Sequence, residues 1–253
     1  MPLRKPAWVL IGLAAAVVAL WASWDTAKMR DLRYRWTYKW ISNNPQRVAD
    51  AFAILYHAKG DETFNNLRWF GTPIQKNPMD LWIYQEMITE IKPDVIVECG
   101  TYKGGSAYFM AHMMDLIGKG RIVTIDIEKY PNLPVHPRIT YLLGSSTDPS
   151  IVKQVRDFIK PGDTVMVFLD SDHRAPHVSQ ELDLYSGLVT SGSYIVVEDT
   201  DLNGHPILPK HGPGPMEAAQ AFLKSHPAFQ VDPAREKLML SFNPKGYLKR
   251  VSQ

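Results

Sequence analysis

From Lys92 onward, short runs of β-branched and apolar residues alternate with stretches of helical spacing, and this alternation most constrains the fold. The predicted strands are 94–98, 121–125, 139–142, 164–169 and 193–198. The predicted helices are 104–117, 148–159, 175–189 and 215–225. Strands that alternate with helices form a mostly parallel sheet covered on both faces. We therefore predict an α/β fold with a doubly wound, mostly parallel sheet.

Two more strands are predicted near the C-terminus, at 228–232 and 237–242, joined by the short sequence DPARE. A short connection favours antiparallel pairing, so these strands should form a hairpin at one edge of the sheet. Upstream, 47–59 and 80–91 have the apolar spacing of helices. The segment RWFGTPIQKNPMD between them is predicted to be a loop, because it contains glycine and prolines.

The first segment differs from the rest, because no charged residue occurs from Ala7 to Trp24. As a helix it would be about 27 Å long, at the short end of what spans a bilayer. Arg4 and Lys5 would also suit a cleaved signal peptide. Trp21 and Trp24 suit a membrane interface better than a cleavage site. We favour a transmembrane anchor; the alternatives are a cleaved signal and a buried or partner-binding helix.

Basic residues are more frequent in 28–40 than before the apolar segment. The positive-inside rule then predicts a single-pass, membrane-anchored protein whose catalytic domain faces the cytoplasm. The stretch 28–40 would lie on anionic headgroups or form a solvated linker helix, and both readings stay open. The predicted domains are an anchor at 1–27, a linker with amphipathic helices at 28–65, and a catalytic domain at 66–253.

Charge and cysteine content exclude some classes. The 28 basic and 26 acidic residues leave a formal net charge of +2, so nothing in the overall charge predicts nucleic-acid binding. Cys99 is the single cysteine of the sequence, which excludes an internal disulfide framework and fits a reducing compartment.

A glycine-rich turn follows the first predicted strand. Gly100, Gly104 and Gly105 would let the backbone approach a ligand closely. Their spacing is neither the dinucleotide fingerprint nor a P-loop. Glu98 would place a negative charge at the site, which suits a ligand with an amino group and a sulfonium better than a pyrophosphate. The alternative is a tight strand-to-helix turn that simply needs glycine.

Two later strand ends would complete a nucleoside site. Asp126 ends the second predicted strand, and an acid at that position commonly accepts hydrogen bonds from a ribose. The alternative for Asp126 is a helix cap or a surface residue. Ser145 and Ser146 follow the third predicted strand and could approach an adenine ring.

Acidic residues cluster after the next two predicted strands. Asp170 and Asp172 follow one strand, whereas Glu198, Asp199 and Asp201 follow the other. Converging carboxylates repel one another, and a hard divalent cation such as Mg²⁺, Mn²⁺ or Ca²⁺ relieves this. His173 beside such a site could accept a proton. Helix caps, salt bridges and a structural histidine are the alternatives.

Five stretches together carry a resemblance to a known family. They are GTPIQKNPMDLWIYQEMI, VIVECGTYKGGSA, FLDSDH, GSYIVVEDTD and GPGPMEAAQAFL. The sequence over about 65–245 resembles the cephalosporin hydroxylase and rhamnosyl O-methyltransferase family. The resemblance implies a Rossmann-like class I methyltransferase that uses S-adenosylmethionine and a divalent metal, usually Mg²⁺. Residues 1–40 have no counterpart in it.

The resemblance also implies roles for individual residues. The methionine part of the cofactor would lie against Glu98, Gly100, Thr101, Tyr102, Gly104, Gly105 and Ser106, with Asp170 nearby. Asp126 would hold the ribose, and Ser145 and Ser146 would lie by the adenine. Asp170, Glu198 and Asp199 would bind the metal. His173 would be the catalytic base, beside Asp170.

The resulting expectation is a metal-dependent O-methyltransferase that acts on a hydroxyl of a sugar, a glycolipid or another small-molecule or lipid-linked polyol. Three alternatives stay open. A nicotinamide oxidoreductase would need a glycine spacing that the turn lacks. A metal-dependent hydrolase would leave the Glu98 turn and Asp126 without a role. A membrane-tethered, non-catalytic or hydroxylase-named member would keep the fold alone. The state of oligomerisation is also left open.

Overall fold

A seven-stranded sheet forms the centre of the protein in the computed structural model, which describes residues 26–252. The strand order is β5-β4-β3-β6-β7-β9-β8. The strands are β3 (Val95–Cys99), β4 (Arg121–Asp126), β5 (Ile139–Leu143), β6 (Val165–Leu169), β7 (Tyr194–Val197), β8 (Phe229–Val231) and β9 (Tyr247–Arg250). The strands β3 to β7 pair in parallel, and β9 pairs antiparallel with both β7 and β8. The predicted mostly parallel sheet is confirmed.

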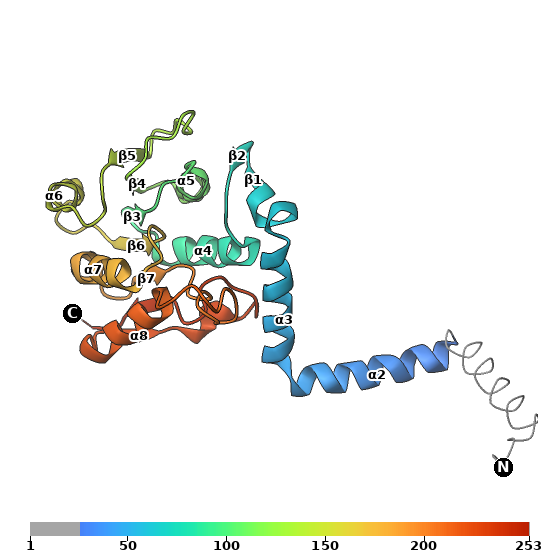
Figure 1. The fold of residues 1–253 in the computed structure, drawn as a ribbon. Coiled ribbons are helices and arrows are strands. Elements are labelled where there is room, and N and C mark those ends of the chain that lie inside the picture. The colour runs from blue at the N-terminus through green and yellow to red at the C-terminus, as the bar shows by residue number, and fades with distance from the viewer. Residues whose placement is uncertain (1–25, 253) are drawn as a thin grey trace, which may run out of the picture. The chain divides into compact units, whose positions relative to one another are not determined.

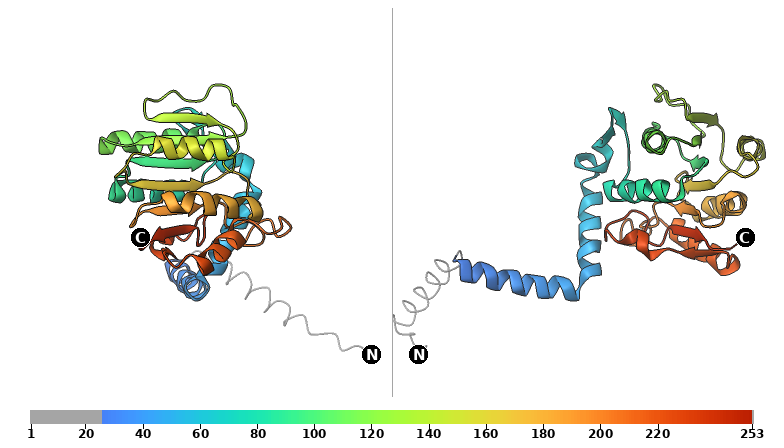
Figure 2. Two further views of the ribbon diagram at one scale, coloured as in Figure 1. Left: turned by 90° about the vertical axis from the view of Figure 1, so that its left-hand side faces the viewer. Right: turned by 180° about the vertical axis from the view of Figure 1, so that it is seen from behind.

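Helices cover both faces of this sheet (Figure 1). One layer consists of α4 (Pro78–Ile91) and α5 (Gly105–Ile117), and the other of α6 (Pro149–Phe158), α7 (Ala175–Tyr185) and α8 (Pro215–Ser225). In the left view of Figure 2, α6, α7 and α8 lie in front of the strands. Each layer packs on the sheet through its own cluster of buried apolar side chains. The fold is therefore a three-layer α/β arrangement.

The central strands are buried on both faces, which explains why their sequences are continuously apolar. In β3, Val95 and Val97 pack towards α6 and α7, whereas Ile96 packs towards α4 and α5. The neighbours of β3 are β4 on one side and β6 on the other. The strand order thus reverses at β3, and a crevice is expected at the carboxyl ends of these strands.

Helix starts follow local sequence signals. Asn77 caps α4 through its side chain, which accepts from the Met79 N–H, and a proline follows as the first helical residue. Asp148 caps α6 in the same way. Short elements complete this part of the chain: η1 (Gly60–Glu62), η2 (Phe64–Asn66), β1 (Arg68–Trp69), β2 (Thr72–Pro73), η3 (Ser186–Leu188) and η4 (Pro233–Glu236).

The antiparallel edge exists, but the prediction for its last strand was wrong in position. That strand is β9, and no strand forms over the predicted 237–242. The reason lies in the buried carboxylate of Asp80 on α4. It accepts hydrogen bonds from the Ser241 hydroxyl at 2.6 Å and the Phe242 N–H at 2.8 Å. These contacts hold the predicted strand segment as an irregular connection against α4.

The described part of the chain begins with α2 (Ala27–Asn43), which is followed by α3 (Pro45–Ala58). Contacts divide the chain into two units between Ala49 and Asp50. In α2 no residue is buried, and Trp36 and Trp40 are exposed. The predicted transmembrane segment, 7–24, lies outside the described residues. Among residues 26–252, no helix combines the length and apolarity needed to cross a membrane. The three predicted domains stay a prediction.

Candidate functional site

A cavity of about 540 Å³ lies at the carboxyl ends of the parallel strands. Its size falls within the range of small-molecule sites. It is lined by residues that follow each of five strands, together with a segment that precedes α4. The lining residues that we predicted are Gly100, Thr101, Tyr102, Gly105, Ser106, Asp126, Ser145, Ser146, Asp170, His173 and Asp199. The structure therefore brings most of the predicted site residues to one place.

The glycine turn after β3 is needed for close packing as well as for access. A Cβ atom on Gly100, whose φ is +105°, would lie 1.9 Å from the Asp170 carbonyl oxygen. A Cβ atom on Gly105 would lie 2.2 Å from the Pro73 carbonyl oxygen. Gly104 precedes the first residue of α5 and does not line the cavity. Glycine thus lets the ends of β3 and β6 approach each other beside the cavity.

Glu98 lies beneath the cavity and does not line it. Only 1% of this residue is exposed. Its carboxylate accepts from the hydroxyls of Ser106 and Thr124, each at 2.5 Å. Burial raises the pKa of Glu98 to about 7, although these two hydrogen bonds lower it. Glu98 therefore acts on the cavity through hydroxyl groups and does not face a ligand directly.

Asp126 ends β4 and does face the cavity. One carboxylate oxygen accepts from the Tyr102 N–H at 2.7 Å, and the other from the Glu128 N–H at 2.9 Å. These bonds fix the carboxylate while leaving further lone pairs for a ligand. Ser145 and Ser146 follow β5 and line the cavity beyond Asp126.

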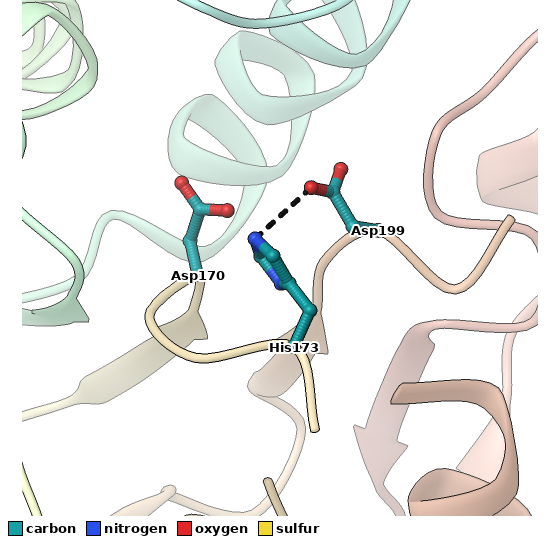
Figure 3. Close-up of side chains that lie close together, drawn as sticks. All are labelled: Asp170, His173 and Asp199. Carbon is teal, nitrogen blue, oxygen red and sulfur yellow. Dashed lines mark ion pairs between the residues drawn. The ribbon is translucent and has the colours of Figure 1, made fainter. Parts of the chain in front are cut away.

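Asp170, His173 and Asp199 gather at the other end of the cavity (Figure 3). Each offers one ligand atom, and these atoms all lie within 4.8 Å of one another. Asp170 follows β6, His173 lies in the loop after it, and Asp199 follows β7. The His173 Nε2 is 3.2 Å from an Asp199 carboxylate oxygen. Two carboxylates and an imidazole at this spacing are a donor set for a divalent cation.

The backbone at Asp199 is held in an uncommon conformation. Its φ is +54°, in the left-handed region that few non-glycine residues adopt. The Asp199 N–H donates to the Asn243 side-chain oxygen at 2.9 Å. Asn243 is fully buried, and its amide also donates to the Tyr84 hydroxyl. The core therefore supports the strained residue that turns the Asp199 carboxylate towards Asp170 and His173.

Lys76 is a site residue that the sequence analysis missed. Its buried ammonium contacts the Asp170 carboxylate and lies 2.5 Å from the Glu198 carboxylate. Burial lowers the pKa of Lys76, but the two carboxylates raise it by more, so it stays charged. Burial raises the pKa of Asp170 and Glu198, and the ammonium opposes this rise. Glu198 is 3% exposed and lies outside the group of Asp170, His173 and Asp199.

Further lining residues had weak sequence signals. Lys76 and Gln75 belong to the loop before α4, and its composition showed only that it was a loop. Ser171 and His177 flank the predicted His173, and Tyr130 lies after β4. Lys76 lies in GTPIQKNPMDLWIYQEMI, one of the five stretches that carried the resemblance, and this was the available signal for it. Its spatial partner, Glu198, is more than a hundred residues away.

Comparison with known proteins identifies relatives over most of the chain. The family described as Rhamnosyl O-methyltransferase/CmcI matches residues 61–251. A rhamnosyl O-methyltransferase of Mycobacterium leprae (strain TN) is 37% identical over 227 residues, which cover 86% of this chain and 99% of the relative. One of Mycobacterium tuberculosis (strain ATCC 25618 / H37Rv) is 36% identical over 214 residues, covering 81% and 87%.

Solved structures of CmcI share the fold. An apo structure has a TM-score of 0.59 at 20% identity and covers 75% of this chain and 78% of its own. A structure described as holding Mg and SAM has a TM-score of 0.57 at 19% identity, with the same coverage. The fold and the sequence matches agree, and they confirm the resemblance carried by the five stretches. This chain belongs to the rhamnosyl O-methyltransferase/CmcI family.

Proposed function

We propose that this protein transfers a methyl group from S-adenosylmethionine to a hydroxyl oxygen of a rhamnosyl or similar sugar. One observation carries the proposal: a single cavity has the glycine turn and Asp126 on one side and the group of Asp170, His173 and Asp199 on the other. The relatives with 36–37% identity are named for this reaction. A nucleoside site next to a candidate cation site is the arrangement that the reaction requires.

The cavity residues fit the cofactor. The turn at Gly100 carries no side chain to block a ligand beside Asp170. Asp126 offers free carboxylate lone pairs to two neighbouring ribose hydroxyls, because each of its oxygens accepts one backbone N–H and can accept more. Ser145 and Ser146 would lie by the base, and Ser106, held by Glu98, by the methionine part.

The residues at the other end fit a divalent cation. Asp170 and Asp199 present carboxylates to the same space, with side chains 21% and 30% exposed. Lys76 already contacts both Asp170 and Glu198, so those two carboxylates converge on one positive charge. We propose Asp170 and Asp199, with Glu198 behind them, as the carboxylates that hold Mg²⁺ or a similar ion.

When bound, S-adenosylmethionine supplies an electrophilic methyl group and the cation lowers the pKa of the acceptor hydroxyl. His173 would take the hydroxyl proton at Nε2, while the oxygen–methyl bond forms and the sulfur–methyl bond breaks. The Asp199 carboxylate lies 3.2 Å from that nitrogen and would accept a hydrogen bond from the Nε2–H once it forms, which would stabilise the imidazolium. The cavity walls would hold the reacting atoms in line, which contributes much of the rate of such transfers.

The membrane anchor and the lipid-linked acceptor are also proposals. The support is the uncharged stretch from Ala7 to Trp24, followed by the basic, tryptophan-containing stretch 28–40. An anchored catalytic domain on the cytoplasmic face would meet acceptors embedded in the same membrane. A glycolipid with neighbouring sugar hydroxyls would combine this location with an acceptor that can contact a cation.

The test is methyl transfer to rhamnosides of known structure. The full chain is incubated with methyl-labelled S-adenosylmethionine, Mg²⁺ and an alkyl rhamnoside, and products are identified by mass. We expect a singly methylated sugar, and no product once EDTA removes the cation. His173→Ala should lower the rate by about 100-fold to 10,000-fold. Asp183→Asn, on the exposed side of α7, is the control. Undiminished transfer by His173→Ala would contradict the role of His173.

A further inference from the structure

A buried carboxylate of α7 lies against the cavity and has no part in the proposed chemistry. Glu181 is 0% exposed. Its Oε1 accepts from the Ser146 hydroxyl at 2.5 Å and from the Ser171 hydroxyl at 2.6 Å. The other oxygen, Oε2, is buried and has no hydrogen-bond partner within the described part of the chain. Burying a carboxylate oxygen without a hydrogen-bond partner costs free energy, so the position of Glu181 needs an explanation.

The groups that gather on Glu181 come from separate elements and share the cavity. Ser146 follows β5, Ser171 follows β6, and His177 lies one turn before Glu181 on α7. All three line the cavity, whereas Glu181 does not. The His177 Nε2 is 3.4 Å from Glu181 Oε1 and 3.2 Å from the Ser146 hydroxyl oxygen. Glu181 is therefore the common partner behind one wall of the cavity.

The carboxylate fixes the direction of these hydrogen bonds. A hydroxyl group has one proton and two lone pairs, and Glu181 Oε1 accepts a hydrogen bond from each of the two serine hydroxyls. Ser146 and Ser171 each direct their single proton towards Glu181. Only lone pairs of these two hydroxyls remain available to a ligand. The wall therefore accepts hydrogen bonds and cannot donate them from Ser146 or Ser171.

We propose that Glu181 turns Ser146 and Ser171 into a hydrogen-bond acceptor site for an exocyclic amino group on the base of the cofactor. The inference rests on the proposed function, since it places the base of the nucleoside at this wall. An amino group at that position donates to the serine oxygens. A carbonyl oxygen there would face lone pairs and leave both acceptors unpaired. Glu181 is thus a positioning residue that selects adenine over a base with a carbonyl at the same ring position.

The test compares two ligands whose bases differ in the exocyclic group at that position, the inosyl base also carrying a proton on the adjacent ring nitrogen N1. Dissociation constants of S-adenosylhomocysteine and S-inosylhomocysteine are measured calorimetrically with the full chain. Wild type should prefer the adenosyl ligand by about 30-fold, because the inosyl carbonyl leaves buried acceptors unpaired. In Glu181→Gln the side-chain amide can donate to a serine, and that serine can turn its proton to the cavity. The preference should then fall to about threefold or less.

Two further variants keep the test decisive. Ser171→Ala removes one acceptor without changing a buried charge, so it should reduce the preference severalfold even if Glu181→Gln does not fold. Asp183→Asn, also on α7 but exposed, should keep the wild-type preference. Equal binding of both ligands to wild type would overturn the inference and leave the proposed function intact. If neither ligand binds wild type, the proposed function fails, and the inference fails with it.

Discussion

The cavity has acidic residues in two contrasting settings. At one end, Asp170 and Asp199 face the cavity beside His173. Behind the cavity lining, Glu98 of β3 and Glu181 of α7 are almost fully buried, and each accepts hydrogen bonds from two hydroxyl groups. Asp170 and Asp199 have carboxylate lone pairs that can bind a cation. The oxygens of Glu98 and Glu181 instead accept hydrogen bonds from serine and threonine hydroxyls.

The difference shows how the position of an acid relative to a strand end decides its chemistry. Glu98 lies within β3, and its buried carboxylate bonds to Ser106 of α5 and Thr124 of β4, so it reaches the cavity only through its neighbours. Asp170 and Asp199 follow β6 and β7 and line the cavity. Carboxylates at the open end can attract a cation, while the buried carboxyl groups orient hydroxyl groups.

The largest expected effect comes from removing a carboxylate at the open end of the cavity. Asp199→Asn removes one charge from the donor set and the partner of the His173 imidazole. We expect methyl transfer to fall about a thousandfold at fixed Mg²⁺, as when a preorganised electrostatic group is removed. The rate should be measured across a range of Mg²⁺ concentrations, because weaker cation binding shifts the curve. A wild-type rate and Mg²⁺ dependence in this variant would mean that Asp199 takes no part.

A second variant tests the buried ion pairs behind the open end of the cavity. Lys76→Met leaves the carboxylates of Asp170 and Glu198 without their shared ammonium. Removal of one partner from a buried ion pair should lower the free energy of unfolding by about 3–5 kcal/mol. Denaturant unfolding measures this loss, which should shrink in excess Mg²⁺ as the cation supplies the missing charge.

Lys153→Met is the matched control for this variant. Lys153 pairs with Asp157 on the exposed face of α6, with side chains 74% and 62% exposed. Solvent screening leaves such a pair little effect on stability. Equal stability changes in Lys76→Met and Lys153→Met would show that the buried pair does not hold the open end together.

The third and smallest effect concerns the buried Glu98 and depends on pH. Burial raises the folded-state pKa of Glu98 from the ordinary 4.5 to about 7. Stability from this group is therefore fully present below pH 4.5 and is lost as the pH rises through 7. Relative to Glu98→Gln, wild type should lose about 3 kcal/mol of unfolding free energy over this range.

Glu90→Gln is the control of opposite sign. A hydrogen bond from Arg235 lowers the pKa of Glu90, so its contribution is present above the ordinary pKa and lost as the pH falls. Unfolding should be followed by denaturant titration from about pH 3 to 8 for the three proteins, so that the range covers both transitions. A wild-type curve parallel to that of Glu98→Gln would contradict the buried-carboxylate description of Glu98.

Much of the fold was predictable because its signals are local. Apolar β-branched runs and helical spacing placed the parallel strands, and a glycine or acid after each strand placed the cavity. The last strand was not predictable in this way. Asp80 holds Ser241, Phe242 and the Tyr247 hydroxyl at more than 160 residues' separation, and this long-range pairing decides which segment becomes β9.

Prediction of the candidate site from the sequence was limited in the same way. Strand-end residues such as Asp126, Asp170 and Asp199 were identifiable because parallel strands bring their carboxyl ends together. Lys76 and Glu181 were not, since one lies in a loop and the other on a helix, and neither sequence context reveals a distant partner. The importance of a buried charged residue depends on what surrounds it in space.

The central claim is that Asp170 and Asp199 hold a divalent cation and that Glu98 and Glu181 do not. It is tested most directly by titrating Mn²⁺ into the full chain and following the free ion by electron paramagnetic resonance. We predict a single site in wild type, binding at least about tenfold weaker in Asp199→Asn, and unchanged binding in Glu181→Gln. Equal Mn²⁺ binding by wild type and Asp199→Asn, or its loss in Glu181→Gln alone, would contradict the account.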